Sequence, residues 1–203
     1  MSDQADIFML KNVRCSFPHL FERPIINGEE GKCGAKLLLE PGNKAHAQMI
    51  KAVNFRINEL IKRAFQGKVN IPDEKRCLRK GENTTRPEYA GFYVVSSNHK
   101  TKPVVLGADA QTVITSQEAC QIYSGCRVNA KIQLWVQNNK HGKRINANLV
   151  AIQFAGDDEP FDGSYIPVDE AMEGFEAFED ASGLDMDFDS STGDENFDDD
   201  LLN

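Results

Sequence analysis

Basic side chains are absent from the last quarter of this 203-residue chain, where residues 157–203 hold 18 Asp and Glu but no Lys or Arg. Residues 1–156 therefore carry 23 basic and 13 acidic side chains, so a body of formal charge +10 is joined to a segment of charge −18. The overall charge of −8 hides this division. A basic body suits a protein that binds a polyanion. An attached acidic segment suits competition for the same surface or recruitment of partners.

Long apolar runs and a signal peptide are also missing. No apolar run approaches the roughly 18 residues of a membrane span, and Met1–Asp6 is acidic where a signal peptide is basic. We therefore expect a soluble intracellular protein that does not bind membranes. The length suits one folded domain at residues 1–156, followed by an acidic, disordered segment at residues 157–203.

The cysteines lack any regular spacing. The chain has five, an odd number with no Cys-x-x-Cys pair, which favours reduced thiols over a disulfide framework. A zinc site remains an alternative, but none of the spacings is a known structural-zinc pattern, so we expect no metal and no cofactor. Its ligands would come from Cys15, His19, Cys120, Cys126 and His141.

Motifs of enzyme chemistry are absent as well. The sequence contains no nucleophile elbow, no glycine-rich phosphate loop and no evident Cys–His pairing, and the 13 acids of the body form no cluster. We therefore expect a binding protein and not an enzyme. Two alternatives stay open: a metal-dependent nuclease that uses carboxylates of the acidic segment, and an acidic inhibitor that mimics DNA.

Periodicity predicts several short strands and one long helix. Asn43 is a suitable N-cap for the helix, whose apolar residues recur every three or four positions up to Gly67. Phe17 is expected in the core, Pro18 is expected to end the first strand, and residues 68–87 read as a long basic loop. A short helix is predicted at residues 115–122, and strands at residues 8–17, 35–39, 91–96, 103–106, 127–137 and 143–154. This pattern favours a β-rich, OB-type antiparallel barrel with one inserted amphipathic helix.

The strand at residues 127–137 places the only tryptophan of the chain among polar side chains. Ile132 and Leu134 share one parity along the strand, whereas Lys131 and Trp135 share the other. A partly exposed aromatic ring beside cations is suited to stacking on bases. Alternatively, Trp135 lies beneath a loop or the acidic segment.

The predicted final hairpin turns at residues 138–142. Lys143 and Arg144 follow the turn, where basic side chains are well placed to hold phosphates. Further along, the parity of the apolar side chains shifts near Val150, which marks either a β-bulge or a strand covered on both faces.

Six groups of short motifs occur in a recognisable order. They are Val13–Pro18, Leu39–Pro41, Arg79–Gly81 with Tyr89–Tyr93, Lys102–Val105, Ile122–Val128 and Asn148–Phe154. Their order resembles a family of tailed-phage single-stranded-DNA-binding proteins, formerly described as a domain of unknown function, over roughly residues 8–165. The resemblance implies an OB-fold protein that coats single-stranded DNA during phage replication and recombination, in the cytoplasm of the infected host cell.

The candidate DNA-binding residues come from two sources. The resemblance implies contacts from Arg14, Arg79, Lys80, Tyr89, Tyr93 and Arg127. Strand parity and charge add Lys131, Trp135, Lys143 and Arg144.

The resemblance also implies that the acidic segment contacts replication or recombination proteins. Tails of this kind typically finish with acids and a terminal phenylalanine, whereas here three aspartates precede Leu201, Leu202 and Asn203. Phenylalanines recur among the acids of the segment, which favours a docking role over a purely solvating linker. The expected partner-binding residues are Phe197, Asp198, Asp199, Asp200, Leu201 and Leu202. The oligomeric state stays open, a homodimer included.

Overall fold

The computed structural model describes residues 6–84, 86–116 and 121–161. These residues belong to the first of two compact units, Met1–Tyr165, whereas the second unit, Ile166–Asn203, lies outside them. The predicted partner-binding residues at 197–202 and the predicted disorder of the acidic segment beyond residue 161 therefore lie outside the described residues. The predicted short helix at residues 115–122 lies largely outside them too.

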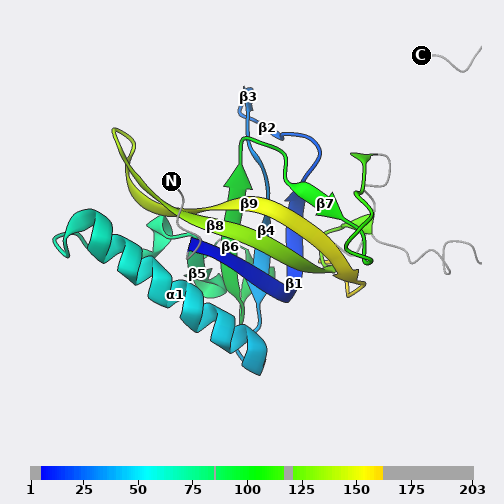
Figure 1. The fold of residues 1–203 in the computed structure, drawn as a ribbon, viewed down its shortest axis with the longest axis horizontal. Helices are drawn as coiled ribbons and strands as arrows, with labels where there is room; N and C mark the ends of the chain where they lie inside the picture. The colour runs from blue at the N-terminus through cyan, green and yellow to red at the C-terminus, as the bar shows by residue number, and fades with distance from the viewer. Residues whose placement is uncertain (1–5, 85, 117–120, 162–203) are drawn as a thin grey trace, which may run out of the picture. The chain divides into compact units, whose positions relative to one another are not determined.

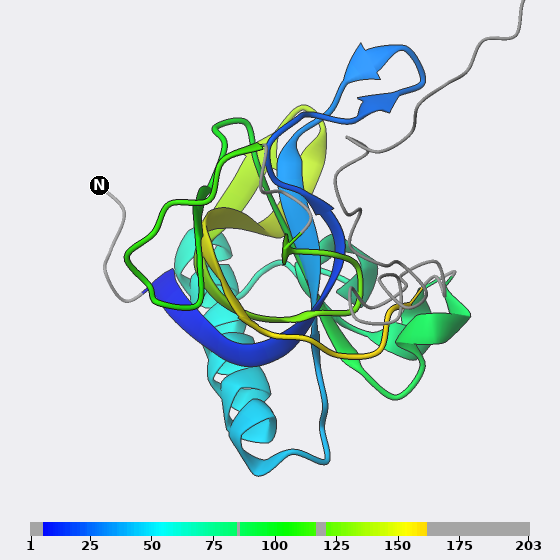
Figure 2. The same cartoon turned by 90° about the vertical axis from the view of Figure 1, so that its right-hand side faces the viewer.

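Five strands curl into a closed barrel (Figures 1 and 2). They are β1 (Ile7–His19), β4 (Cys33–Leu39), β6 (Tyr93–His99), β8 (Arg127–Asn139) and β9 (Gly142–Gly156). Around the barrel the order is β6-β4-β1-β8-β9, and β9 closes the ring by pairing with β6 at Ser97 and Ala147. The prediction of an OB-type barrel is confirmed. The pairings of β9 with β6 and β7 are parallel, which strand periodicity does not specify.

Shorter elements decorate the barrel. Strand β5 (Leu78–Lys80) extends the sheet beyond β6, and β7 (Val104–Leu106) extends it beyond β9. A separate hairpin of β2 (Ile25–Ile26) and β3 (Glu29–Glu30) projects from the barrel (Figure 2). Three short 3-10 turns are η2 (Asp73–Lys75), η3 (Gly81–Asn83) and η4 (Pro87–Tyr89). The segment predicted as one long basic loop thus contains a strand, which at three residues is too short to show a period.

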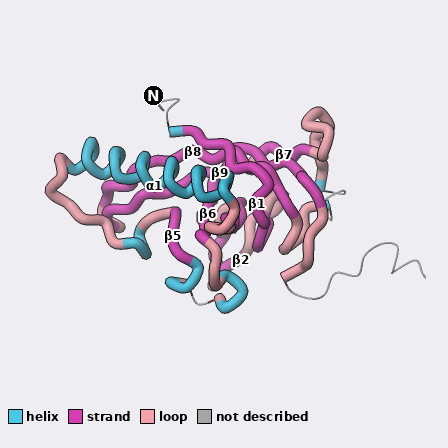
Figure 3. The backbone as a smooth tube through the Cα atoms, turned by 90° about the horizontal axis from the view of Figure 1, so that it is seen from below, coloured by secondary structure: helices cyan, strands magenta, loops and turns pink. Residues whose placement is uncertain are grey.

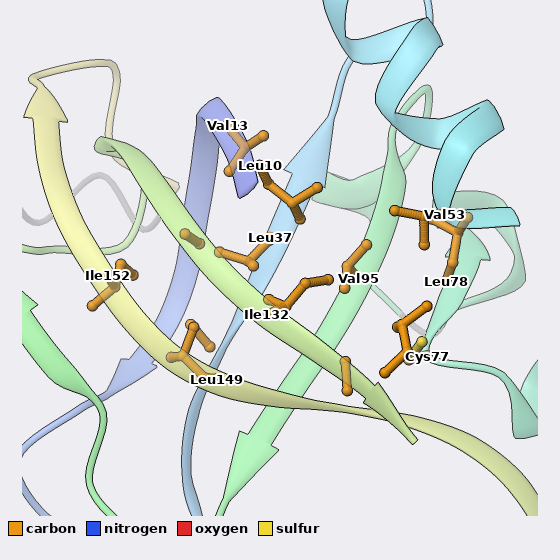
Figure 4. Close-up of a cluster of buried hydrophobic side chains, with 14 of the residues drawn as sticks. Leu10, Val13, Leu37, Val53, Cys77, Leu78, Val95, Ile132, Leu149 and Ile152 are labelled. Atoms are coloured by element: carbon orange, nitrogen blue, oxygen red, sulfur yellow. The ribbon is translucent and has the colours of Figure 1, made fainter. Parts of the chain in front are cut away.

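Alternating side chains build the core. On β8, Val128, Ala130, Ile132 and Leu134 are buried inside the barrel, while the residues between them are at least partly exposed, as their parity predicts. Figure 4 shows Ile132 beside side chains from β1, β4, β6 and β9. Because apolar surface removed from water contributes roughly 25 cal/mol per Å², this shared interior stabilises the closed ring.

Helix α1 (Lys44–Phe65) lies along one side of the barrel (Figure 3). The Asn43 side chain accepts hydrogen bonds from the Ala45 and His46 N–H groups, and Gln66 ends the helix in the left-handed conformation, as predicted for a helix between Asn43 and Gly67. Its apolar face packs on the barrel through Val53, shown in Figure 4, and through Ile57. In the part of the chain that the structure describes, no helix is both long and apolar enough to cross a membrane.

Register shifts interrupt several strand pairings of the barrel wall, and two of them bear on the sequence predictions. Lys131 pairs with Ala151 but Ile132 pairs with Leu149, which leaves Val150 as the extra, exposed residue and confirms that the parity shift marks a bulge. On β1 the register with β4 shifts between Ser16 and His19, so the strand continues through Pro18. The prediction that Pro18 ends the strand is therefore wrong, because a bulge accommodates its missing N–H.

Gly34 gives a test of barrel packing. A Cβ atom there would lie 2.2 Å from the Ser97 carbonyl oxygen on β6, whereas one at Gly42 would meet nothing within 4 Å. We expect Gly34→Ala to lower the free energy of unfolding by about 1–3 kcal/mol, measured by urea denaturation. The control Gly42→Ala should stay within about 0.5 kcal/mol of the parent chain. Equal stability of the two variants would contradict the close approach of β4 and β6.

Candidate functional site

The outer face of β4, β5 and β6 carries a small group of polar side chains. Lys36 on β4 lies opposite Ser96 on β6, and Arg79 on β5 lies opposite Val94. These residues have the parity opposite to the buried Leu37 and Val95, so barrel packing turns them outward. The site is therefore fixed by strands and not by loops.

Two cations share one hydroxyl group at this site. The Lys36 ammonium and the Arg79 guanidinium both donate to the Ser96 Oγ, each at 3.0 Å. Because that oxygen accepts both bonds, its own O–H remains available to donate. Within the described residues neither cation forms an ion pair. Burial, and then the charge of Arg79, lowers the pKa of Lys36, so an anion placed here would stabilise both charges.

Two adjoining cavities lie over this face. The larger has a volume of about 750 Å³ and the smaller about 210 Å³. We call the two together the cationic groove. Both cavities are lined by Lys32, Lys36, Arg79, Ser96 and Asn98. Among the described residues that line the groove, Glu74 in the smaller cavity is the only acid, so the groove is strongly electropositive.

Trp135 lines only the smaller cavity, together with Lys75 and Arg144. Its ring is partly exposed, on the same strand face as Lys131, as parity predicts. Its indole nitrogen, however, is buried and has no hydrogen-bond partner among the described residues. Trp135 therefore forms a wall of a small polar cavity.

An aromatic pair lines only the larger cavity. Phe17 is 37% exposed and lines this cavity. The prediction that it lies in the core is wrong, because the β1 bulge turns the side chain outward. Tyr89 is 3% exposed, and its hydroxyl group hydrogen-bonds to the Ser16 Oγ at 3.0 Å. Burial, only partly offset by that hydrogen bond, raises the pKa of Tyr89. Tyr89 thus supports the cavity wall as a neutral side chain.

Arg14 and Arg127, two predicted DNA contacts, are paired with acids. The Asp158 carboxylate lies 3.6 Å from the Arg14 Nε and accepts a hydrogen bond from the Arg127 Nε. Glu40 lies 2.7 Å from the other end of the Arg127 guanidinium. Both arginines are therefore electrically compensated, unlike Lys36 and Arg79.

Residues 157–161, the start of the acidic segment, pack against the barrel. The Asp158 N–H donates to the Tyr123 hydroxyl oxygen, and the Phe161 N–H donates to the Ser124 carbonyl at 3.2 Å. Gly125 lies so close that a Cβ atom there would be 2.5 Å from the Glu159 carbonyl oxygen. The Phe161 ring lies under Arg14 and packs against a small apolar cluster of Leu38, Tyr89 and Val94.

The other predicted contacts lie outside the cationic groove. Lys80 and Tyr93 line another cavity of about 640 Å³ beside α1, which shares Arg79 with the groove. Lys131 is exposed on β8 and lines none of these cavities. Lys143 extends over the Phe65 ring at 5.1 Å. Of the ten predicted residues, the groove brings together Arg79, Tyr89, Trp135 and Arg144.

Several groove residues were missed in the sequence. Lys36 had a visible signal, since it is the only polar side chain in an otherwise apolar strand. Lys32, Ser96 and Asn98 had none, because polar residues near turns are common on any surface. Arg86 is 4.3 Å from the Phe17 ring, a contact that sequence spacing does not suggest.

No group of three or more His, Cys, Asp or Glu side chains in the described residues is placed to hold a metal ion. Burial raises the pKa of the Cys77 and Cys126 thiols to about 12 and that of Cys15 well above its ordinary value. These groups are therefore protonated thiols at neutral pH and poor metal ligands.

The chain is similar to phage proteins that bind single-stranded DNA. Residues 7–184 match the family model described as Enterobacter phage Enc34, ssDNA-binding protein. The structure of the Enc34 single-stranded-DNA-binding protein in complex with ssDNA superposes with a TM-score of 0.69 at 32% identity, covering 78% of this chain and 90% of that one. Protein p50 of Acyrthosiphon pisum secondary endosymbiont phage 1 is 31% identical over 161 residues, 76% of this chain and 85% of that protein.

A more distant structure shares the fold alone. The single-stranded-DNA-binding protein gp2.5 of bacteriophage T7 has a TM-score of 0.53 at 11% identity, covering 82% of this chain and 99% of that one.

The Asp158 ion pairs give a pH-dependent prediction. Partial burial acts to raise the pKa of Asp158, but the Glu159 N–H and the Arg127 and Arg14 guanidinium groups outweigh it and lower that pKa. The stabilisation is therefore present above the ordinary Asp pKa of about 3.9 and is lost as the pH falls below it. We expect Asp158→Asn to lower the unfolding free energy by about 1 kcal/mol at pH 7.

The same comparison at pH 3 should show a smaller difference, because below the ordinary Asp pKa the unfolded chain binds a proton that the ion-paired carboxylate resists. Glu29→Gln, at an exposed position on β3, is the control and should change little at either pH. A difference that stays constant from pH 7 to pH 3 in chemical denaturation would argue against the ion pairs.

Proposed function

The chain belongs to the single-stranded-DNA-binding protein family described for Enterobacter phage Enc34, and from this membership we propose that it binds single-stranded DNA along the cationic groove. The observation that carries the proposal is that Lys36 and Arg79 both donate to the Ser96 hydroxyl group while neither has an ion-pair partner within the described residues. The family is one of binding proteins and not of enzymes, so its relatives argue against the nuclease alternative.

Phosphate neutralisation supplies the main driving force in this proposal. Lys36 and Arg79 stay partly buried with uncompensated charge, so a phosphate that reaches them recovers electrostatic energy and releases counterions. The Ser96 O–H donates a further hydrogen bond to an oxygen of the same phosphate in this proposal. Contacts of this kind are made to the phosphates of the DNA backbone and do not distinguish one base from another, so binding is expected to be sequence-independent.

In this proposal the remaining predicted contacts differ in how directly they reach the DNA. Trp135 and Arg144 line the smaller cavity, and Tyr89 supports the larger one. Lys80, Tyr93, Lys131 and Lys143 would serve as peripheral contacts, since they lie outside the groove. Arg14 and Arg127 would reach DNA only by exchanging their carboxylate partners, Asp158 and Glu40, for phosphates.

We further propose that the acidic segment competes with DNA and recruits replication or recombination proteins. The support is charge: 15 of its 18 acids follow Phe161, and the body that they accompany is basic. Phe197, Asp198–Asp200, Leu201 and Leu202 remain the proposed partner-binding residues. The proposed setting is phage replication and recombination in the cytoplasm of the infected cell.

Removal of one groove cation tests the binding proposal. We expect Arg79→Gln to weaken oligothymidine binding about tenfold and to reduce the salt-dependence slope by about 0.7, the value for one phosphate contact on single strands. Fluorescence anisotropy of a labelled oligothymidine, repeated over a range of salt concentrations, measures both quantities.

Lys44→Gln is the matched control, since Lys44 is an exposed cation on α1 away from the groove. It should leave the affinity nearly unchanged. Equal losses from the two variants would mean that general positive charge, and not the groove, binds the strand. No binding by the parent chain at any salt concentration would overturn the proposed function itself.

Two truncations separate the roles of the acidic segment. Ending the chain after Phe161 removes 15 acids but keeps the packed residues 157–161, whereas ending it after Gly156 also removes Phe161 from its apolar cluster. We expect both truncations to tighten DNA binding at low salt, because local negative charge is removed. Only the shorter chain should also lose thermal stability. Unchanged or weaker binding by the longer truncated chain would exclude competition.

A further inference from the structure

Phe17 occupies an unusual backbone position on β1. Phe17 and Pro18 together oppose one residue of β4, so the strand carries an extra residue there. Phe17 has a φ of 49°, in the left-handed region that large side chains rarely adopt. Such strain costs on the order of 1–3 kcal/mol and clusters at ligand sites, where bulges re-aim side chains. The Phe17 ring itself does not join the core.

The bulge delivers the ring to the larger cavity of the cationic groove. Phe17 is 37% exposed and lines that cavity together with two residues of the projecting hairpin region. They are Ile26, on β2, and Pro24, which directly precedes β2. Lys36 and Arg79 line the same cavity. An apolar ring thus shares one space with the two unpaired cations, the combination that a nucleotide with its flat base and its phosphate requires.

A guanidinium group already lies against the ring. The Arg86 Cζ is 4.3 Å from the centroid of Phe17, a cation–π distance, and Arg86 also pairs with Glu88 at 3.4 Å. Arg86 therefore covers one face of the ring, while the Phe17 side chain as a whole stays 37% exposed. A guanidinium stacked on an aromatic ring also adds positive charge beside any bound strand.

We infer that Phe17 is the principal base-stacking residue of the groove, with one base of the bound strand packed on the ring face opposite Arg86. This inference rests on the proposed function. The cavity of about 750 Å³ falls within the usual range for ligand pockets, whereas the cavity of about 210 Å³ beside Trp135 falls below it. The larger cavity therefore suits a base, and the smaller one suits phosphate.

Relocating the single tryptophan tests the inference directly. The double variant Phe17→Trp, Trp135→Phe carries its only tryptophan in the larger cavity, and we expect oligothymidine to quench its fluorescence to saturation. Phe55→Trp with Trp135→Phe is the control, because Phe55 is 68% exposed on α1 and lies outside the groove. Quenching equal to that of the control, while anisotropy still reports binding, would overturn the role of Phe17 and leave the proposed function intact.

Substitutions in the parent chain provide a second test that does not depend on fluorescence of the protein. Phe17→Ala should weaken oligothymidine binding by roughly 5- to 100-fold, the loss of one stacked base. Phe17→Tyr should keep most of the affinity, and Phe55→Ala should change little. On an abasic strand of the same length, Phe17→Ala should have almost no effect. An equal loss on abasic and thymidine strands would show that Phe17 acts on the fold or on the phosphates, which contradicts stacking.

Discussion

Alternation of side chains across the barrel wall is the constraint on which this structure depends. The interior of the closed five-stranded ring is filled almost entirely by apolar side chains, so the strands send their charged residues outward. On β4 and β6 this rule leaves Lys36 and Ser96 facing each other on the outer surface, with Arg79 added from β5. The same packing that closes the core therefore builds a rigid cationic surface, which loops would hold less accurately.

Much of this arrangement was visible in the sequence, because long elements repeat their pattern often enough to be recognised. The helix after Asn43 and the strand that carries Trp135 follow from periodicity, and a parity shift near Val150 narrowed that position to a bulge or a strand covered on both faces. The three residues of β5 cannot show a period, so the strand that positions Arg79 was predicted as loop. The parallel closure of β9 on β6 depends on residues about 50 positions apart, which no local pattern encodes.

The site was harder to predict than the fold because charge alone does not distinguish a free cation from a paired one. Arg14 and Arg127 look as basic in the sequence as Arg79 does, yet Asp158 and Glu40 neutralise them from distant parts of the chain. Phe17 was misjudged for a related reason. Pro18 can either end a strand or sit in a bulge, and only the pairing with β4 distinguishes the two.

The two edge strands of the sheet affect how readily one molecule pairs with another. In the described residues the barrel sheet is bordered by β5 and β7, each three residues long. Exposed backbone N–H and C=O groups at a sheet edge can pair with the edge of another molecule, and long edges promote aggregation. Under the proposed binding along single-stranded DNA, copies placed side by side on one strand would meet at high local concentration. Borders this short leave little backbone for such pairing.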